Sequence, residues 1–389
     1  MVEDTPGAYL DHAAATTIDP RVRAAMSRHL DGAFGNPESL HDWARDPADA
    51  IDAARRHVAE LIGGDAAGVI FTAGDTEARN LAIKGVAAAN AHVGTHLVAS
   101  AVEHPATLAA CRTLTRGSAT LTGVGVDSEG RIDPVALAAA VRPDTAVVSI
   151  VHGQHEIGTV QDVPALVSAV RAANPTVAIH VDAGATAGLV AVDVDAWGCD
   201  LLTIGGGSLL GPRWTGALWV REGTRLHPLI EGGLQEGGKR GGAHDVPGIV
   251  GLGAAARLAR AERDARAAHM GGLADRLIDR LLEVADVRLN GPRRGRIPGH
   301  VQVSAGGVEG ETLTLALATR GVAASPGSAC SAVGKASPVL EAIGLEAPWT
   351  HSAVLFTLAP STTPAEVERG ADAFAAAVAE LRATSPIAG

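Results

Sequence analysis

The sequence predicts an α/β fold, in which a large and mostly parallel sheet is covered by helices and a smaller α+β part follows at the C-terminal end. Between about residues 50 and 220, short runs rich in β-branched residues alternate with alanine-rich helical stretches. The runs are apolar at consecutive positions, which is typical of strands buried on both faces of a parallel sheet. They lie at residues 69–72, 96–99, 146–151, 177–181, 201–204 and 217–220.

The second part of the chain has a different pattern. From about residue 249 to 285, leucine and alanine recur at spacings of three and four, which predicts a helix that would link two domains. Strand-like segments at 301–303 and 354–356 and a helical segment at 366–383 follow. We therefore assign residues 15–258 to the large domain, and residues 1–14 and 259–389 to a small α+β domain.

Composition narrows the functional classes. The chain has 389 residues and a formal net charge of −11, and its positive charges are spread along the sequence. Neither a nucleic-acid groove nor an anionic membrane surface is indicated, so a small molecule or a protein is the expected partner. No basic segment followed by an apolar stretch opens the chain, and no apolar run approaches the ~20 residues of a membrane span. We expect a cytoplasmic protein.

The three cysteines are too few and too scattered for a disulfide framework or a zinc site. Cys111 and Cys199 lie in apolar surroundings and are expected to fill core positions, because free cysteine packs as a small hydrophobe. Cys330 lies among small residues at 325–334, a composition that favours an exposed, flexible loop. It is the best single candidate for a working thiol.

Seven segments, in order along nearly the whole chain, resemble the cysteine desulfurases that supply sulfur for iron–sulfur clusters and thiolated tRNA. They are YLDHAA at 9–14, GNPESLH at 35–41, FTAGDTE at 71–77, EHP at 103–105, HEIGT at 155–159, HVDA at 180–183 and GSAC at 327–330.

The resemblance implies the fold of fold type I pyridoxal phosphate (PLP) enzymes, those of the class V aminotransferase group, with a seven-stranded large sheet. It also implies a homodimer with PLP at the subunit interface. In that family a mobile cysteine attacks the sulfur of a cysteine–PLP adduct and leaves alanine and an enzyme persulfide, while PLP serves as the electron sink. The position of Cys330 matches that cysteine.

Three further positions match cofactor contacts of the family, each with a structural alternative. Asp182 aligns with the aspartate that keeps the pyridine nitrogen protonated, or it is a strand-end residue that caps a loop. His104 aligns with the imidazole that stacks on the ring, or it is a satisfied structural histidine. Thr76, beside Gly74 at an expected helix N-terminus, aligns with a phosphate contact or serves as an N-cap.

The lysine that binds PLP in the family is missing. Ser208 stands at its position in the segment DLLTIGGGSLLGP at 200–212, and a serine hydroxyl cannot form an imine. Other changed positions of the cofactor and substrate pocket, by the same resemblance, are Gly205, Gly207, His155, Ala185, Ala243 and Leu355. Losing three or four phosphate contacts worth about 1.5–3 kcal/mol each would weaken PLP binding by several orders of magnitude.

Only three lysines occur in the chain, at Lys84, Lys239 and Lys335. Lys84 aligns with a helical lysine of the family that lies away from the pocket, and Lys335 follows the cysteine loop. Lys239 is the one plausible substitute, because its loop reaches the neighbouring subunit's phosphate site in the family. Its alternative role is contact with phosphate or solvent.

Three functional hypotheses follow. The first is a degenerate desulfurase-like protein that relays persulfide sulfur through Cys330, or acts as a scaffold or partner, in a homodimer or in a heterodimer with an active paralogue. The second is an atypical active desulfurase with non-covalent PLP or a substitute lysine. The third is a repurposed enzyme whose 205–208 loop binds another anionic ligand.

Overall fold

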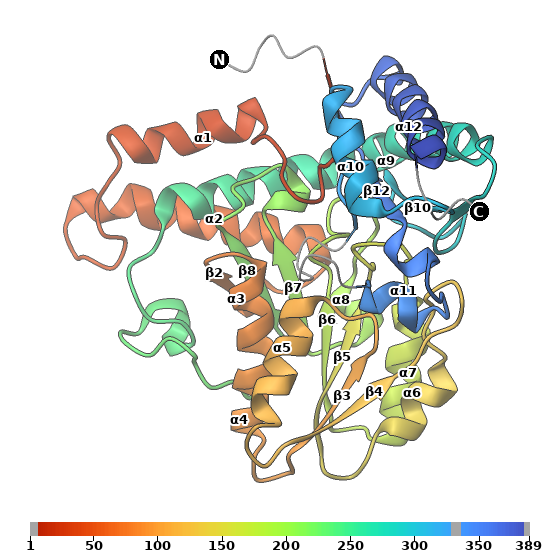
Figure 1. Ribbon diagram of the computed structural model, residues 1–389. Coiled ribbons are helices and arrows are strands. Elements are labelled where there is room, and N and C mark those ends of the chain that lie inside the picture. The colour runs from red at the N-terminus through yellow and green to blue at the C-terminus, as the bar shows by residue number, and fades with distance from the viewer. Residues whose placement is uncertain (1–6, 328–335, 385–389) are drawn as a thin grey trace.

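The computed structural model describes residues 7–327 and 336–384, and Cys330 and Lys335 lie outside the described residues. A seven-stranded sheet forms the centre of the larger part (Figure 1). In chain order its strands are β2 (Val69–Thr72), β3 (His96–Ser100), β4 (Thr120–Val124), β5 (Thr145–Val151), β6 (Ala178–Asp182), β7 (Leu201–Gly205) and β8 (Gly216–Val220).

The spatial order of these strands is β2-β8-β7-β6-β5-β3-β4. β4, β3, β5, β6 and β7 pair in parallel, and β8 is antiparallel to both of its neighbours. The mostly parallel seven-stranded sheet expected from the sequence is therefore confirmed.

Helices cover both faces of this sheet, since successive residues of a strand point to opposite sides. On one face, Ile70, Leu97 and Leu218 pack with the helices that follow β2 and β3. On the other face, Phe71 and Val148 pack with helices from the start, middle and end of the large part. The helices of this part are α1 (Pro20–Asp31), α2 (Arg45–Ile62), α3 (Asp75–Asn80), the π-helical η3 (Leu81–Gly85), α4 (Val86–Ala89), α5 (Pro105–Leu114), α6 (Pro134–Ala140), α7 (Val163–Ala173) and α8 (Val194–Trp197), with 3₁₀ turns η1 (Asp42–Ala44), η2 (Ala66–Gly68), η4 (Gly207–Leu209) and η5 (Gln235–Gly238).

Helix α9 (Val246–Leu282) runs from the large part into the small one. Its first half packs in the core of the large part, up to Ala259, and its last turns, from Leu273, pack in a second core together with Ala8 and Leu10. The domain boundary predicted at residues 258 and 259 lies within this helix and stays a prediction.

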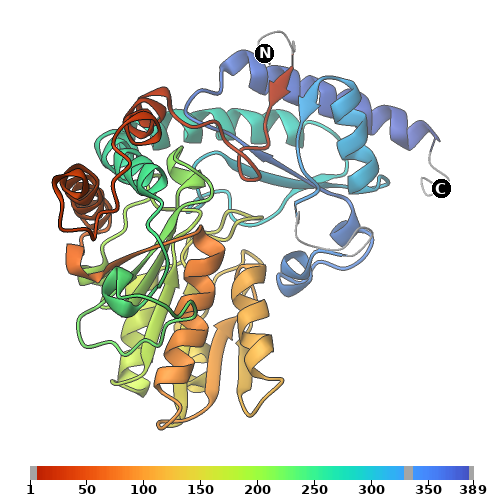
Figure 2. The ribbon, with the colours of Figure 1, turned by 90° about the vertical axis from the view of Figure 1, so that its left-hand side faces the viewer.

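The smaller part is α+β, as expected. An antiparallel sheet of order β12-β10-β9 packs with a parallel pair, β1 and β11, with the helices that follow β10 and β12, and with the last turns of α9 (Figure 2). The elements are β1 (Ala8–Tyr9), β9 (Val287–Leu289), β10 (His300–Ala305), α10 (Gly310–Thr319), β11 (Val322–Ala323), α11 (Pro338–Ala342), η6 (Trp349–His351), β12 (Ala353–Thr357) and α12 (Pro364–Thr384).

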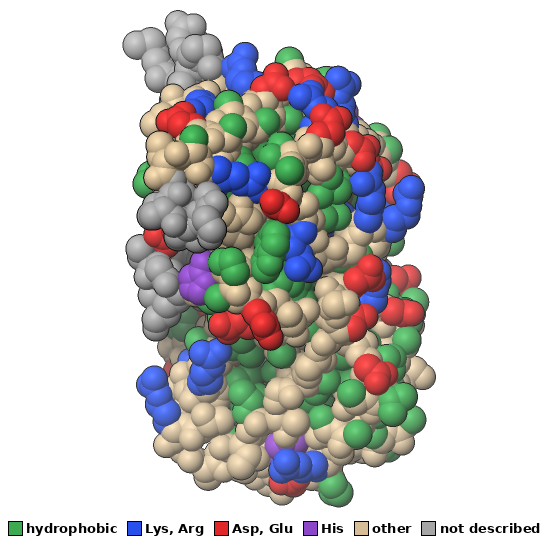
Figure 3. Space-filling model, turned by 45° about the vertical axis from the view of Figure 1, so that its right-hand side comes forward, with side chains coloured by type: hydrophobic (Ala, Val, Ile, Leu, Met, Phe, Trp, Pro, Cys, Tyr) green, Lys and Arg blue, Asp and Glu red, His purple; other side chains and the backbone are tan. Residues whose placement is uncertain are grey.

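Acidic and basic side chains are interspersed over the upper part of the face shown in Figure 3. Many of them form ion pairs between helices, such as those of Arg276 and Arg280 on α9 with Glu368 on α12. Among the described helices, none has the length and apolar character that crossing a membrane requires.

Candidate functional site

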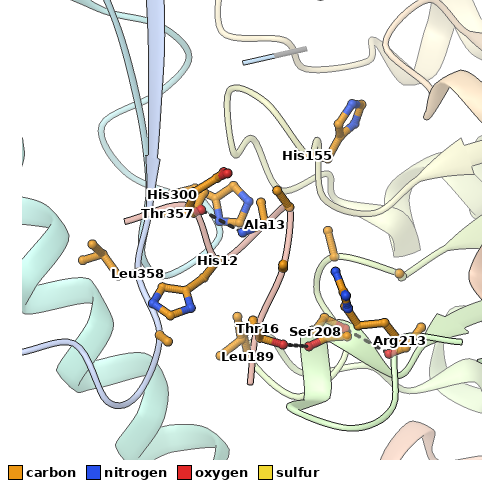
Figure 4. A pocket seen from close by; sticks show the side chains of 18 of the residues that line it. His12, Ala13, Thr16, His155, Leu189, Ser208, Arg213, His300, Thr357 and Leu358 are labelled. Carbon is orange, nitrogen blue, oxygen red and sulfur yellow. Dashed lines mark hydrogen bonds between the residues drawn. The ribbon is translucent and has the colours of Figure 1, made fainter. Parts of the chain in front are cut away.

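A cavity of about 430 Å³ lies between the carboxyl ends of the central strands and the smaller sheet. Such a position is the usual ligand site of an open α/β sheet. In Figure 4, Ser208 and Arg213 line one side, and His12, Thr357 and Leu358 face them from the side of the smaller sheet. The cavity therefore combines residues that are far apart in the sequence.

Asp182 ends the central strand β6 below this cavity and forms a buried pair with Arg79 of α3. Arg79 Nε donates to Oδ2 of Asp182 at 2.6 Å, and Arg79 Nη2 donates to Oδ1 at 3.2 Å. The backbone N–H of Gly184 also donates to Oδ1, at 2.9 Å. Arg79 is 3% exposed and Asp182 is 2% exposed, so both charges are almost completely removed from water.

Asp75 completes an ion triad. It opens α3 and lies one helical turn before Arg79, a spacing that places both side chains on the same side of a helix. Its Oδ2 lies 2.9 Å from Arg79 Nη1. The Asp75 side chain is 37% exposed, so it carries its charge to the wall of the cavity.

The triad fixes the protonation states of its members. Burial raises the pKa of Asp182, but the charge of Arg79 and its hydrogen bonds outweigh burial and hold that pKa well below its ordinary value. Burial lowers the pKa of Arg79, and the charges of Asp182 and Asp75 reverse this effect, so the net shift is upward. A carboxylate and a guanidinium thus neutralise each other at the point nearest to the cavity floor.

The glycine-rich turn after β7 forms the adjoining wall. Gly205 ends the strand, and the 3₁₀ turn η4 carries Gly207 and Ser208 into the cavity lining. Ser208 Oγ donates to the Gly205 carbonyl at 3.2 Å, and Thr16 Oγ1 donates to the Gly207 carbonyl at 3.1 Å (Figure 4). The Ser208 hydroxyl, at the expected lysine position, therefore forms a hydrogen bond within its own glycine-rich segment.

Two histidines line the cavity above the triad. The ring centroids of His104 and His155 are 4.9 Å apart, with a 51° angle between the planes. Burial lowers the pKa of His104 to about 4, aided by the charge of Arg79. Burial also lowers the pKa of His155 to about 3, aided by the charges of His104 and Arg79. Both rings are neutral at pH 7.

The side of the cavity near the smaller sheet combines apolar side chains with three buried polar atoms that have no hydrogen-bond partner among the described residues. Leu355 of β12 lines the cavity together with Leu358 and Met270. The three atoms are Asp11 Oδ1, His12 Nδ1 and His300 Nε2. Burial raises the pKa of Asp11 to about 6 and lowers that of His300 to about 3.

The site residues predicted from the sequence are only partly brought together. His104, His155, Gly205, Gly207 and Ser208 line the cavity, and Asp182 reaches it only through Arg79. His104 also satisfies its structural alternative, because its Nδ1 accepts from the Ala106 N–H at 3.1 Å and caps α5. The loop contact predicted for Asp182 is present in its bond with Gly184.

Thr76 is exposed and does not line the cavity, and Gly74 is the N-cap of α3, so the N-cap role was wrong. A phosphate contact of Thr76 stays a prediction.

Cys111 and Cys199 are 1% and 0% exposed, and burial raises the pKa of each thiol to about 12, which confirms their assignment to the core.

Arg79 and Asp75 were missed as site residues. The motif FTAGDTE, which carries part of the family resemblance, ends at Glu77, and a basic residue in a helix is usually solvated. The available signal was the spacing of four between Asp75 and Arg79, directly after a buried strand. It indicates an ion pair on that helix face, but it gives no hint of Asp182.

Comparison with known proteins agrees with this geometry. Residues 8–369 match the family model of aminotransferase class-V. The chain belongs to the aminotransferase class-V family. It is 40% identical to "Cysteine desulfurase IscS" of Dictyoglomus turgidum over 97% of this chain and 96% of the relative, and 38% identical to "Cysteine desulfurase IscS 1" of Archaeoglobus fulgidus over 97% and 99%.

Solved structures give the same result. A "NIFS-like protein" superposes with a TM-score of 0.91 at 28% identity, covering 96% of this chain and 100% of that one. DndA from Streptomyces lividans superposes with a TM-score of 0.76 at 28% identity, covering 90% and 99%. The fold and the relation to cysteine desulfurases are thereby established.

Aminotransferase class-V proteins are PLP enzymes, and PLP requires particular groups in the lining of its site. The cofactor requires an amine for its aldehyde, a free carboxylate for its ring nitrogen and an environment that favours its phosphate. No lysine is present among the described residues that line the cavity. Asp182 already neutralises Arg79, and the Asp75 carboxylate lies beside the glycine-rich turn. The described residues therefore do not fit PLP.

The neutral histidines predict a pH dependence of stability. Below pH 6.5 the unfolded chain binds protons that the folded His155 does not bind, so the free energy of unfolding falls as the pH drops from about 6.5 towards the folded pKa of about 3. His155→Asn should remove this contribution and reduce the slope between pH 4.5 and 6 by up to about 1.4 kcal/mol per pH unit. Urea unfolding at several pH values measures the slope.

The matched control is His227→Asn, which changes an exposed histidine outside the cavity. This variant keeps His155, so the slope that His155 contributes should remain. An unchanged slope in His155→Asn would contradict a buried, neutral His155.

Proposed function

We propose that this chain is a desulfurase-like sulfur carrier that works through Cys330 and does not perform PLP-dependent desulfuration. The observation that supports this most is the pair between Arg79 and Asp182, because it uses up the carboxylate that a pyridinium would need. In addition, Ser208, in the turn after β7 of the same sheet, has a hydroxyl and no amine that could bind the aldehyde of PLP. The remaining chemistry of the family is then the thiol.

The alternatives have less support. Lys239 lines a different cavity, with Arg55, Glu236 and His244, and does not line the one that holds the histidines. A substitute lysine at that position would have to act from a partner chain. An anionic ligand at the glycine-rich turn would meet Asp75, whose Oδ2 lies 3.2 Å from where a Cβ on Gly205 would be.

Sulfur transfer needs only a thiolate and a persulfide donor. The Cys330 thiolate would attack the outer sulfur of a donor R–S–SH, and the donor thiolate R–S⁻ would leave with the electron pair of the broken S–S bond. Cys330 then carries the transferred sulfur as a persulfide, and no external oxidant or reductant is consumed. The buried Cys111 and Cys199, with pKa values of about 12, are poor competitors for this step.

We further propose that the chain works as a dimer, with itself or with an active paralogue. Four large apolar side chains of one segment are each more than half exposed, and the rings of two of them, Phe34 and Trp43, have centroids 5.6 Å apart. Clustered exposed aromatic groups are typical of an interface. The four are Leu30, Phe34, Leu40 and Trp43.

Light scattering on the purified protein measures this directly. The expected result is the mass of two chains, and Phe34→Ser combined with Trp43→Ser should shift the population towards single chains. Single chains at all concentrations would contradict a homodimer, and only co-purification with a paralogue would then preserve the proposal.

For the cofactor, we expect the protein to be colourless after incubation with PLP and removal of free cofactor. Borohydride reduction followed by peptide mass mapping should find no pyridoxyl group on a lysine. A label that disappears in Lys239→Arg would identify that residue as a substitute lysine and contradict the proposal. A retained chromophore that is not fixed by borohydride would support non-covalent PLP instead.

For the thiol, incubation with a low-molecular-weight persulfide should add one sulfur atom to Cys330, detected by peptide mass mapping. Cys330→Ser should lose this modification, whereas Cys111→Ser should keep it because Cys111 is buried. An unreactive Cys330 in the folded protein would end the sulfur-carrier proposal.

A further inference from the structure

The ion triad below the cavity has the form of an occupied cation site. The Arg79 guanidinium lies between the carboxylates of Asp75 and Asp182, which come from a helix and from the end of a central strand. Asp182 receives two N–H groups of the same guanidinium, and the Gly184 amide holds one of its oxygens in place. The anion is thus oriented by the backbone as well as by Arg79.

Two glycines leave the space that the triad fills. A Cβ at Gly184 would lie 2.4 Å from Arg79 Nη2, and a Cβ at Gly205 would lie 3.2 Å from Asp75 Oδ2. Gly184 has no room for any side chain without a shift of the guanidinium. The glycines at these two positions therefore leave the room that the planar guanidinium and its carboxylate partner occupy.

We propose that Arg79 is a built-in occupant of a planar-cation site formed by the carboxylates of Asp75 and Asp182, with Asp182 held in place by the Gly184 N–H, and that removing the Arg79 side chain opens this site to an external planar monocation. Guanidinium compounds are the first class of ligand, because they reproduce the fork of N–H donors. A pyridinium, such as that of PLP, is the second. This inference rests on the proposed loss of PLP chemistry. It adds a second reason for that loss, the occupation of Asp182 by Arg79, which is independent of Ser208.

The proposal predicts how substitutions of Arg79 and Asp182 change the stability of the protein. A buried ion pair contributes little by comparison with an apolar replacement of both partners, but removal of one partner leaves a buried charge without compensation. Arg79→Ala should therefore be much less stable than the unchanged protein. Arg79→Ala combined with Asp182→Asn should recover part of that loss, because the uncompensated carboxylate is gone.

Chemical rescue tests the site without any cofactor. Ethylguanidinium at millimolar concentration should raise the melting temperature of Arg79→Ala in a saturable way and leave the unchanged protein unaffected. Tetramethylammonium has the same charge but no N–H donors, so it should have no effect. The double variant with Asp182→Asn should not respond to ethylguanidinium.

The proposal is overturned if ethylguanidinium fails to stabilise Arg79→Ala, or stabilises it no more than the double variant. If Arg79→Ala does not fold without added ligand, the amount of folded protein recovered with and without ethylguanidinium becomes the measurement. Arg79→Lys keeps the charge but not the fork, and its stability should lie between those of Arg79→Ala and the unchanged protein.

Restoring the lysine tests the link with PLP. Ser208→Lys alone should acquire little pyridoxyl label at position 208 after incubation with PLP and borohydride reduction. Ser208→Lys combined with Arg79→Ala should acquire at least tenfold more. Equal labelling of the two variants would show that Arg79 does not exclude the cofactor, whereas labelling of the unchanged chain would contradict the proposed function and leave the rescue result untouched.

Discussion

The buried pair between Arg79 and Asp182 is the interaction on which the rest of the site depends. Asp182 ends a strand in the middle of the large sheet, where a charge without a partner is strongly unfavourable. A guanidinium from α3 neutralises it, and this guanidinium needs the space left by Gly184. This contact joins α3 to the end of β6 beside the cavity.

The triad also sets the electrostatic character of the cavity. With Arg79 held at the floor, protonation of His104 and His155 is disfavoured by its charge as well as by burial. On the opposite side, the apolar side chains of Leu355, Leu358 and Met270 line the cavity. The cavity retains the volume of a ligand site, but its lining differs from that expected for a PLP enzyme with an anionic substrate.

The sequence predicts much of the fold, because its signals are local. Apolar runs between helical stretches identify the strands, and ordered motifs establish the family. Ser208 could also be placed by its position between an apolar strand and Gly211-Pro212. The partner of Asp182 could not be found in this way, because Arg79 is 103 residues distant in sequence and the two side chains meet only in the tertiary structure.

The same limit applies to the side of the cavity near the smaller sheet. Asp11 was known as part of a motif, but its raised pKa results from burial between parts of the chain that are distant in sequence. His300 carries no recognisable motif, and its place in the lining depends on the register of β10 against β12. Such contacts belong to tertiary packing and leave no periodic signal.

A crystal structure of the protein grown in the presence of excess PLP tests the central claim most directly. The account predicts that Arg79 Nε remains within hydrogen-bond distance of Asp182 Oδ2 and that no ring nitrogen approaches this carboxylate. A PLP ring bound with its nitrogen on Asp182, and Arg79 turned away from it, would contradict the account.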